Sequence, residues 1–318
     1  MNRNNKTYDH GISMVDAEYG QSGIASIYLL EQKGQVAIIE TGTNHSVPLV
    51  EAVLKSKGLS FDDVAYVIPT HVHLDHAGGA GEFMHLCQNA TLVVHPYGAA
   101  HLIDPSKLIA GTIAVYGEDE FNKLYGNVRP VDESRVIQAP AFHSIDFNGR
   151  ELQFIDTPGH ARHHFCVYDK QSESIFTGDT FGISYPQLTT KQGRVIFATT
   201  TPIQFDPDAL LQSIDSLMLL NPKTMYLTHF GSITPTPDIV KQLKDSIRMF
   251  SNIALEARND VNETDNRVDY IQQKLKDYLL DTIDEMGAEN SKEFYEENIE
   301  FDTKLNAQGL DFWLSKSA

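Results

Sequence analysis

The chain has 318 residues, of which 41% are hydrophobic and 21% are charged, as is typical of a globular protein with a sizeable core. Its 25 basic and 43 acidic residues give a net charge of −18 at pH 7. This charge repels phosphate backbones and anionic membrane surfaces, so it argues against nucleic acid and membranes as partners and favours a small-molecule substrate.

The start of the chain has no apolar run typical of a secretory signal. No stretch approaches the roughly 20 apolar residues that span a bilayer. The two cysteines, Cys87 and Cys166, lie far apart without a metal-ligand spacing, so we expect reduced, buried side chains. These features together predict a cytoplasmic protein.

Strands and helices alternate along the first half of the chain. Two β-rich runs at 24–30 and 35–41 predict a hairpin. Helical spacing at 47–58 predicts a helix that ends at glycine, and the apolar run at 64–70 predicts a buried strand. The expected elements that follow are a helix through 80–88, a strand at 91–96 and a mainly helical stretch from 99 to 125.

The second half repeats this rhythm, with strands predicted at 150–160, 163–170, 173–180 and 224–231. A helix is predicted over 206–220, with Asp206 as its N-cap. Interleaved strands and helices in both halves predict an α/β fold built in layers.

Beyond residue 235 the chain is expected to be helical, with Thr236 and Pro237 suited to the N-cap and first turn. No low-complexity linker precedes this region. We therefore predict a catalytic domain over 1–235 and a helical extension over 236–318 that packs on the same domain. The long helices are compatible with a homodimer.

The segment "THVHLDHAGG" at 70–79 places four metal-binding side chains within six positions. His71 and His73 lie two apart at a strand end, so their rings leave the same face of an extended segment. Asp75 and His76 follow after the chain turns, so their side chains are directed to a second position next to the one that His71 and His73 reach. Two such pairs suit two metal ions, and the glycines after them let the backbone pass close by.

Three later strands end in further donors, namely His160, Asp179 and His229. The carboxyl ends of strands are where α/β sheets place their active sites. Imidazole and carboxylate suit zinc, and also iron, manganese or nickel.

The motifs "THVHLDHAGG", "DTPGH", "FTGDT" and "LTHFG", in this order, resemble the four metal-binding motifs of the metallo-β-lactamase-fold superfamily, as in glyoxalase II. The resemblance covers roughly residues 10 to 235. The segments beginning "VVHPYGAAHL" and "TTPIQFDPDA" are similar to an uncharacterised microbial branch of metal-dependent hydrolases in that superfamily. The resemblance implies an αββα sandwich with the site along one edge of the paired sheets.

The resemblance also implies a role for each donor. The first metal would be held by His71, His73 and His160, and the second by Asp75, His76 and His229. Asp179 would bridge both metals.

Two positions near these ligands carry weaker expectations. The family usually has an aspartate in a "DTG" turn that orients a metal ligand by a hydrogen bond, and here the turn is "ETG" with Glu40. The longer side chain is compatible with a direct contact or with one mediated by water. His164 lies where many relatives carry a histidine or serine near the metals. It is equally compatible with a strand-end histidine bonded to the backbone.

Two divalent ions, zinc first among them, would lower the pKa of water from about 15.7 to about 7. We therefore expect hydrolysis of an ester, thioester, lactone or phosphoester, with Asp75 or Asp179 accepting the proton. Tyr185 could donate a hydrogen bond to a developing oxyanion, or it could be a packed loop aromatic. Residues 99–125 and the C-terminal helices are candidates for a lid, with Leu108 and Ile113 as apolar lining, or else for core.

Two other functions compete with hydrolysis. A mononuclear iron oxygenase of the persulfide dioxygenase type has nearly the same motifs. The flavin-linked di-iron type usually has a glutamate at the position of His73 and an added flavodoxin domain, so it is disfavoured. A non-catalytic metal-binding protein is disfavoured because all seven ligand positions are filled. The sequence does not identify the substrate.

Overall fold

The computed structural model describes residues 4–190, 192–200, 204–260, 264–288 and 291–316. The chain forms two compact units, each built from segments that are distant in sequence. The first unit comprises Met1–Asp156, His163–Gly178 and Asn221–Ile233. The second unit comprises Thr157–Arg162, Asp179–Leu220 and Thr234–Ala318.

The first unit contains a seven-stranded sheet whose strands pair in chain order. The strands from β1 to β4 are antiparallel, and those from β4 to β7 are parallel. Every residue of β2 is buried, as expected for a strand covered on both faces. The strands are β1 (Lys6–Thr7), β2 (Ile12–Asp16), β3 (Ser26–Gln32), β4 (Gln35–Ile39), β5 (Val64–Ile68), β6 (Thr91–Val94) and β7 (Val136–Gln138).

A second sheet of six strands also lies in the first unit, in the order β15-β14-β11-β10-β9-β8. Its one parallel pair is β11 with β14, and the other neighbours are antiparallel. The strands are β8 (Ser144–Phe147), β9 (Arg150–Asp156), β10 (Phe165–Asp169), β11 (Ser174–Phe176), β14 (Thr224–Leu227) and β15 (Gly231–Ile233).

The two sheets pack face to face through aromatic side chains. The ring of Tyr28 on β3 lies 5.2 Å from that of Phe176 on β11 and 5.3 Å from that of Tyr226 on β14, centroid to centroid. Tyr66 on β5 meets Phe147 on β8 at 6.0 Å. The inner faces of both sheets therefore share the apolar core of the first unit.

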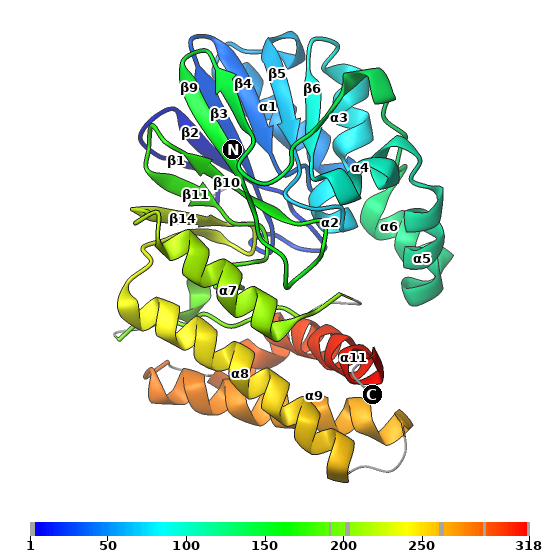
Figure 1. Cartoon of the computed structure of the whole chain (residues 1–318), viewed down its shortest axis with the longest axis vertical. Helices are drawn as coiled ribbons and strands as arrows, with labels where there is room; N and C mark the ends of the chain where they lie inside the picture. The colour runs from blue at the N-terminus through cyan, green and yellow to red at the C-terminus, as the bar shows by residue number, and fades with distance from the viewer. Residues whose placement is uncertain (1–3, 191, 201–203, 261–263, 289–290, 317–318) are drawn as a thin grey trace. The chain divides into compact units, whose positions relative to one another are not determined.

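Helices cover the seven-stranded sheet, with α3 in contact with β5 and β6 (Figure 1). The spacing of Val47, Val50 and Leu54 gives α1 one buried face. The helices of this unit are α1 (Val47–Ser56), α2 (Leu74–Ala77), α3 (Ala80–Leu86), α4 (Pro96–Ile103), α5 (Ser106–Tyr116) and α6 (Glu118–Tyr125). Short 3-10 turns are η1 (Asn44–Ser46), η2 (Phe61–Asp63) and η3 (Glu133–Arg135).

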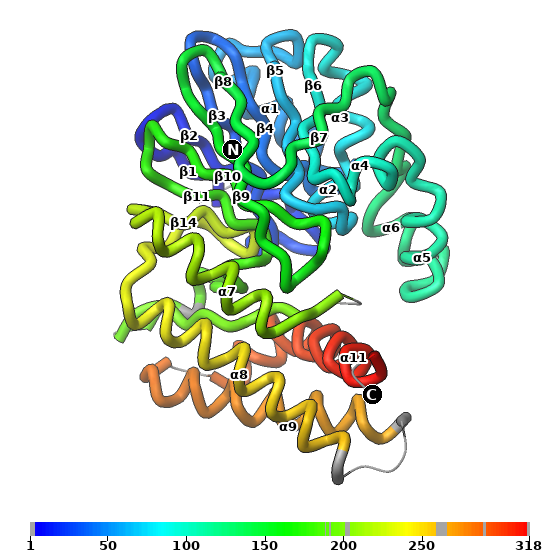
Figure 2. Tube along the Cα trace, in the orientation of Figure 1, coloured from blue at the N-terminus to red at the C-terminus, as the bar shows by residue number. Residues whose placement is uncertain are grey.

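The second unit is mainly helical, and α8, α9 and α11 pack against one another (Figure 2). Asp206 caps α7 by accepting a hydrogen bond from the amide of Ala209 at 3.0 Å. Thr236 caps α8 in the same way, through the amide of Ile239. The elements are η4 (Pro186–Leu188), β12 (Thr189–Thr190), β13 (Gly193–Arg194), α7 (Pro207–Met218), α8 (Pro237–Asp260), α9 (Thr264–Glu285), α10 (Ser291–Phe294), the π-helix η5 (Tyr295–Ile299) and α11 (Glu300–Lys316).

The predicted α/β class is confirmed by the two mixed sheets and their helices. The predicted hairpin is β3 with β4, and both predicted caps are present. The strand predicted over 150–160 ends at Asp156, so its last four residues form a turn. Residues 201–203 of the "TTPIQFDPDA" motif lie outside the described residues. Among the helices that the structure describes, none is long and apolar enough to cross a bilayer.

Candidate metal centre

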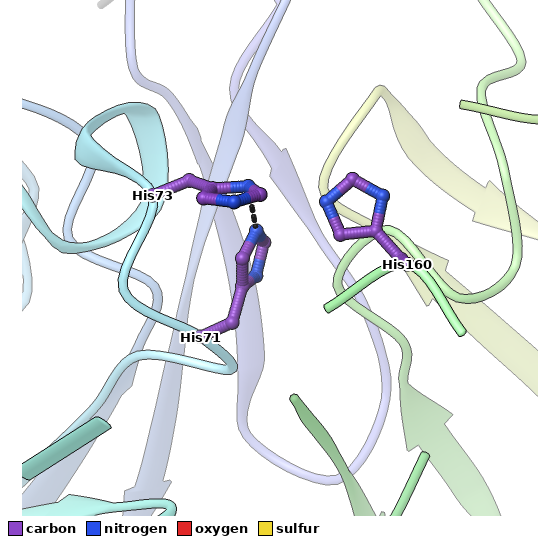
Figure 3. A group of neighbouring side chains, drawn as sticks. All are labelled: His71, His73 and His160. Atoms are coloured by element: carbon purple, nitrogen blue, oxygen red, sulfur yellow. Dashed lines mark hydrogen bonds between the residues drawn. The ribbon is translucent and has the colours of Figure 1, made fainter. Parts of the chain in front are cut away.

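The histidine motif lies where β5 ends and the chain turns into α2. His71 and His73 lie in the extended segment between them, and His73 is the N-cap of α2. Nε2 of His71 and Nδ1 of His73 face each other at 2.8 Å (Figure 3). The expected convergence of the first histidine pair is therefore present.

A trio formed by Asp75, His76 and His229 supplies the clearest ligand geometry in the first unit. One ligand atom from each side chain lies within 4.8 Å of the others. Asp75 Oδ2 lies 3.4 Å from Nε2 of His76 and 3.4 Å from Nε2 of His229. His229 follows the end of β14, so it is distant from α2 in the sequence although it lies beside this helix in the fold.

These separations fit a metal ion better than a direct hydrogen bond. Hydrogen bonds between nitrogen and oxygen usually measure about 2.7–3.2 Å. Ligands bound tetrahedrally at about 2.0–2.1 Å are separated by about 3.3–3.4 Å along each edge of the tetrahedron. The donor types and the spacing in this trio therefore suit a divalent cation.

Glu40 of the "ETG" turn supports this trio from the side opposite the donor atoms, a contact that the sequence left open. Its Oε1 accepts hydrogen bonds from His76 Nδ1 at 3.0 Å, Thr228 Oγ1 at 2.9 Å and Thr70 Oγ1 at 2.6 Å. Its Oε2 accepts from the Thr70 amide at 3.1 Å. The side chain of Glu40 therefore reaches His76 directly, without an intervening water.

The backbone of Glu40 is strained, with a φ of 64°. Side chains rarely adopt this left-handed conformation, which costs roughly 1–2 kcal/mol outside glycine. Such strain persists where surrounding contacts over-determine it, and it concentrates at functional sites. Here the four hydrogen bonds to the carboxylate fix the residue.

Hydrogen bonds also fix the tautomers of His76, His229 and His71. Glu40 can only accept, so Nδ1 of His76 carries the proton and Nε2 is left as the electron-pair donor. The His229 Nδ1 proton goes to the carbonyl of Ile24 at 2.9 Å. Since the hydroxyl proton of Thr70 goes to Glu40, Nδ1 of His71 donates to that hydroxyl at 3.1 Å. In all three rings Nε2 is therefore the unprotonated nitrogen, and a hydrogen bond from the other ring nitrogen is usual in metal-binding histidines.

Asp75 is held in its charged form. Burial by itself would raise the pKa of this carboxyl, but the electrostatic influence of His76, followed by the polar contacts with His229 and His76, lowers the pKa well below its usual range. The side chain keeps 23% of its surface exposed. It is therefore a carboxylate that solvent can still reach.

The glycines after the motif let the chain at the end of α2 approach the "ETG" turn. A Cβ on Gly79 would lie 2.7 Å from the carbonyl oxygen of Thr41 in that turn. The amide of Gly79 donates to the carbonyl of Gly42 at 3.0 Å. Any larger residue would push α2, with its two ligands, away from Glu40.

The remaining predicted ligands, His160 and Asp179, lie in the second unit. His160 Nε2 is 3.4 Å from Asp179 Oδ2, the same separation as in the trio, and both side chains are buried. Nδ1 of His160 faces the carbonyl of Thr199 at 3.4 Å. These two residues therefore form a second pair of metal-type donors.

Tyr185 is buried in the second unit, and its hydroxyl donates to Asp302 at 2.7 Å. Its catalytic role stays a prediction. His164 is fully buried in the first unit, with its ring 4.8 Å from that of His71.

Sequence reasoning gave no role to His163, whose ring stacks on that of His71 at 6.1 Å and an angle of 13°. It also meets the ring of His73 edge-on at 5.6 Å. The signal was the run "HARHH" at 160–164, in which three histidines occur within five positions.

Comparison with known proteins agrees with this site. The family model of the metallo-beta-lactamase superfamily matches residues 21–229. A metallo-beta-lactamase fold-containing protein, ST1585 of Sulfurisphaera tokodaii, is 26% identical over 236 residues, which cover 71% of this chain and 79% of that protein. Its solved structure superimposes with a TM-score of 0.60 at 24% identity, covering 76% of this chain and 87% of that one.

Two further relatives carry named activities. The acyl-coenzyme A thioesterase MBLAC2 of Bos taurus is 26% identical over 190 residues, which cover 55% of this chain and 64% of the relative. The hydroxyacylglutathione hydrolase of Shewanella baltica is 24% identical over 277 residues, which cover 82% of this chain and 90% of the relative.

The family match and the hydrolases among the relatives support a metal-dependent hydrolase with an α/β sandwich. The chain belongs to the metallo-beta-lactamase superfamily. Both statements confirm what the four motifs predicted.

Proposed function

We propose that the chain hydrolyses an ester-type bond of a small molecule at a site that holds two divalent metal ions, with zinc as the first candidate. This proposal rests on the trio of Asp75, His76 and His229. Oδ2 of the aspartate lies 3.4 Å from Nε2 of each histidine, and hydrogen bonds fix the tautomers of both histidines. The net charge of −18 favours a small-molecule substrate over a nucleic acid.

We also propose the ligand set that the four motifs imply. In it, His71, His73 and His160 hold the first metal, and Asp75, His76 and His229 hold the second. Asp179 would bridge both metals.

The proposed reaction adds water to an acyl carbon and breaks the bond to the leaving group. Metal ions bound here would lower the pKa of water to about 7 and polarise the carbonyl. Asp75 remains a carboxylate at neutral pH, so it can accept the proton that water loses. That proton then passes to the leaving thiol or alcohol, and the products are a carboxylic acid and the thiol or alcohol, with no change in oxidation state.

Among the candidate bonds, thioesters come first, followed by esters, lactones and phosphoesters. The name of one relative specifies an acyl-coenzyme A thioesterase, and that of another a hydroxyacylglutathione hydrolase. Both act on acyl groups, and this agreement favours an acyl thioester.

The test is elemental analysis of the purified chain, followed by assays on thioesters, aryl esters, lactones and phosphodiesters. We expect close to two equivalents of a transition metal and turnover of at least one thioester. His73→Ala and Asp179→Ala should abolish turnover while the circular dichroism spectrum changes little. A matched control is His143→Ala, which changes a histidine that no candidate ligand group includes.

Other outcomes would reject the proposal. Iron together with oxygen consumption on a sulfur substrate would instead support the mononuclear oxygenase. A chain that holds no transition metal at neutral pH would support a non-catalytic role.

A further inference from the structure

Side chains of α8 and α11 hold one side of the segment at 196–200, which belongs to the second unit together with both helices. Every second residue of this segment donates its backbone amide to a helix, as a strand donates to a neighbouring strand. The donors are Ile196, Ala198 and Thr200, and the acceptors in the same order are Gln242, Ser246 and Asn306. The two helices therefore take the place of a partner strand.

The residues in between direct their backbone groups to the loops that carry the candidate ligands of this unit. Phe197 and Ile183 exchange backbone hydrogen bonds at 3.1 and 2.8 Å, and Ile183 lies four residues after Asp179. The carbonyl of Thr199 accepts from Nδ1 of His160 at 3.4 Å. Because a carbonyl can only accept, this contact leaves Nε2 of His160 as the electron-pair donor. That nitrogen is the one that lies 3.4 Å from Asp179 Oδ2.

Asn306 holds the backbone on both sides of Thr199. Its Oδ1 accepts from the Thr200 amide at 2.7 Å, and its Nδ2 donates to the Ala198 carbonyl at 3.5 Å. Ser246 accepts from the Ala198 amide at 2.9 Å. Both side chains are only 1% exposed, so water does not compete for these hydrogen bonds. The two helices thus fix the position of the Thr199 carbonyl.

The loop of His160 is itself fixed to α7, which leaves the rotation of the imidazole as the main freedom of this ligand. The carbonyl of Gly159 accepts from the Asp206 amide at 2.8 Å. A Cβ on Gly159 would lie 2.3 Å from the backbone nitrogen of Leu210, so only glycine allows this approach. With the backbone held in this way, the contact with the Thr199 carbonyl determines where the ring of His160 points.

We propose that Asn306 and Ser246 are positioning residues for His160, because they hold the backbone on both sides of Thr199 and so fix the carbonyl that orients the imidazole. This inference rests on the proposed function, in which His160 is a metal ligand. Groups that orient a ligating histidine change metal affinity by about 10- to 100-fold. Asn306 acts through one further contact, so its loss should cost an amount at the lower end of this range.

The test is a titration of cobalt(II) into the metal-free, full-length chain, followed by its visible absorption. His160→Ala identifies the cobalt equivalent that depends on this histidine. Asn306→Leu keeps nearly the same side-chain volume but can neither accept nor donate a hydrogen bond. We expect it to weaken that equivalent by about tenfold and to change its absorption band. Ser246→Ala removes one acceptor and should weaken the same equivalent by a smaller factor.

A double-mutant cycle shows whether Asn306 acts through the histidine. In the His160→Ala background, Asn306→Leu should cause no further loss of cobalt affinity, because the ring that it would orient is gone. Thr303→Val is the matched control, since Thr303 is fully buried in the same helix and its hydroxyl donates to the carbonyl of Ile299. It should leave cobalt binding unchanged, whatever its effect on the unfolding midpoint.

Two results would overturn the inference, namely wild-type cobalt binding by Asn306→Leu or an equal loss of cobalt in Thr303→Val. A further loss in the double variant would also overturn it. If Asn306→Leu does not fold, Ser246→Ala takes its place in the cycle under the same criteria.

The inference and the proposed function fail in different ways. If the cobalt effects appear but no thioester is hydrolysed, the positioning role stands and the proposed function fails. If thioesters are hydrolysed but cobalt binding is insensitive to both helix variants, the reverse holds.

Discussion

At the scale of single residues, Glu40 organises the candidate metal centre by accepting four hydrogen bonds at once. The donors are Thr70, through its amide and hydroxyl, with His76 and Thr228. The backbone φ of this residue is 64°. The sequence predicted the position of this residue, but only the structure shows that its carboxylate reaches His76.

Replacing this carboxylate should weaken metal binding. Glu40→Gln leaves an amide NH₂ that cannot accept a hydrogen bond, so either His76 or Thr70 loses its partner. Since such supporting groups change affinity by about 10- to 100-fold, we expect a loss in that range. Competition with a chelator at neutral pH measures it.

Glu31→Gln serves as the control, because Glu31 is a partly exposed residue whose ion pair is with Lys57. It should leave metal affinity unchanged. Equal affinity of the Glu40→Gln variant and the wild type would show that Glu40 does not orient His76.

Cys87 gives a second prediction at this scale, concerning pH. Burial raises the pKa of its thiol to about 12, with Arg135 opposing the shift and Asp62 adding to it. Because the folded value lies above the unfolded value of about 8.5, the stability from the neutral thiol is present below that pH and declines towards pH 12. We therefore expect no reaction with iodoacetamide at pH 9 in the native state.

The second cysteine, Cys166, is also fully buried, and its thiol donates to the carbonyl of Thr177. Mass spectrometry should thus find no label on either cysteine until denaturant is added. Rapid labelling of Cys87 in the folded chain would contradict the expected inertness of the buried thiol.

At the scale of elements, sequence periodicity predicts long, regular segments more readily than short ones. The hairpin of β3 and β4 is predicted because its apolar pattern runs over about seven residues in β3. Helix α7 is predicted because its pattern is longer and begins with a cap. β7 and β8 span three and four residues, so alternation cannot distinguish them from a loop. No local pattern could reveal that Tyr19 meets Tyr125, which lies 106 residues further along the chain.

Two glycines should respond in opposite ways to the same substitution. Gly79→Ala places a methyl group 2.7 Å from the carbonyl of Thr41, so the overpacking should destabilise the fold by about 1–3 kcal/mol. Gly111→Ala lies within α5 with no atom within 4 Å, so it should stabilise by about 0.5–1 kcal/mol.

Urea unfolding of both glycine variants measures these changes. Metal titration adds a second readout, because displacement of α2 by Gly79→Ala should also weaken metal binding. If Gly79→Ala were as stable as the wild type, the close approach of α2 to the "ETG" turn would not be required.

At the scale of the whole molecule, the predicted extension over 236–318 shares a unit with residues 179–220. Ser246 accepts a hydrogen bond from the amide of Ala198, and Asn306 accepts one from the amide of Thr200. Leu243 lies against Gly182, close enough that any Cβ there would clash with it. The C-terminal helices therefore hold the segment that begins at Asp179.

Truncation after Ile233 should consequently affect the metal content and not only the choice of substrate. The shortened chain loses α8, α9 and α11, whose buried faces include Leu243, Ile247 and Leu310. Without them, the loops that carry His160 and Asp179 have no core to fix them. We expect metal content to fall below half of the wild-type value and limited proteolysis to cut within 179–220.

His73→Ala in the full-length chain is the matched comparison, since it removes a ligand but leaves every helix in place. It should lose metal while segment 179–220 stays resistant to protease, which separates loss of a ligand from loss of its support. A truncated chain that kept both its metal and its resistance would instead assign the C-terminal helices to the substrate pocket. In that case only substrate preference would change, because the ligands of both units would be held by residues before 234.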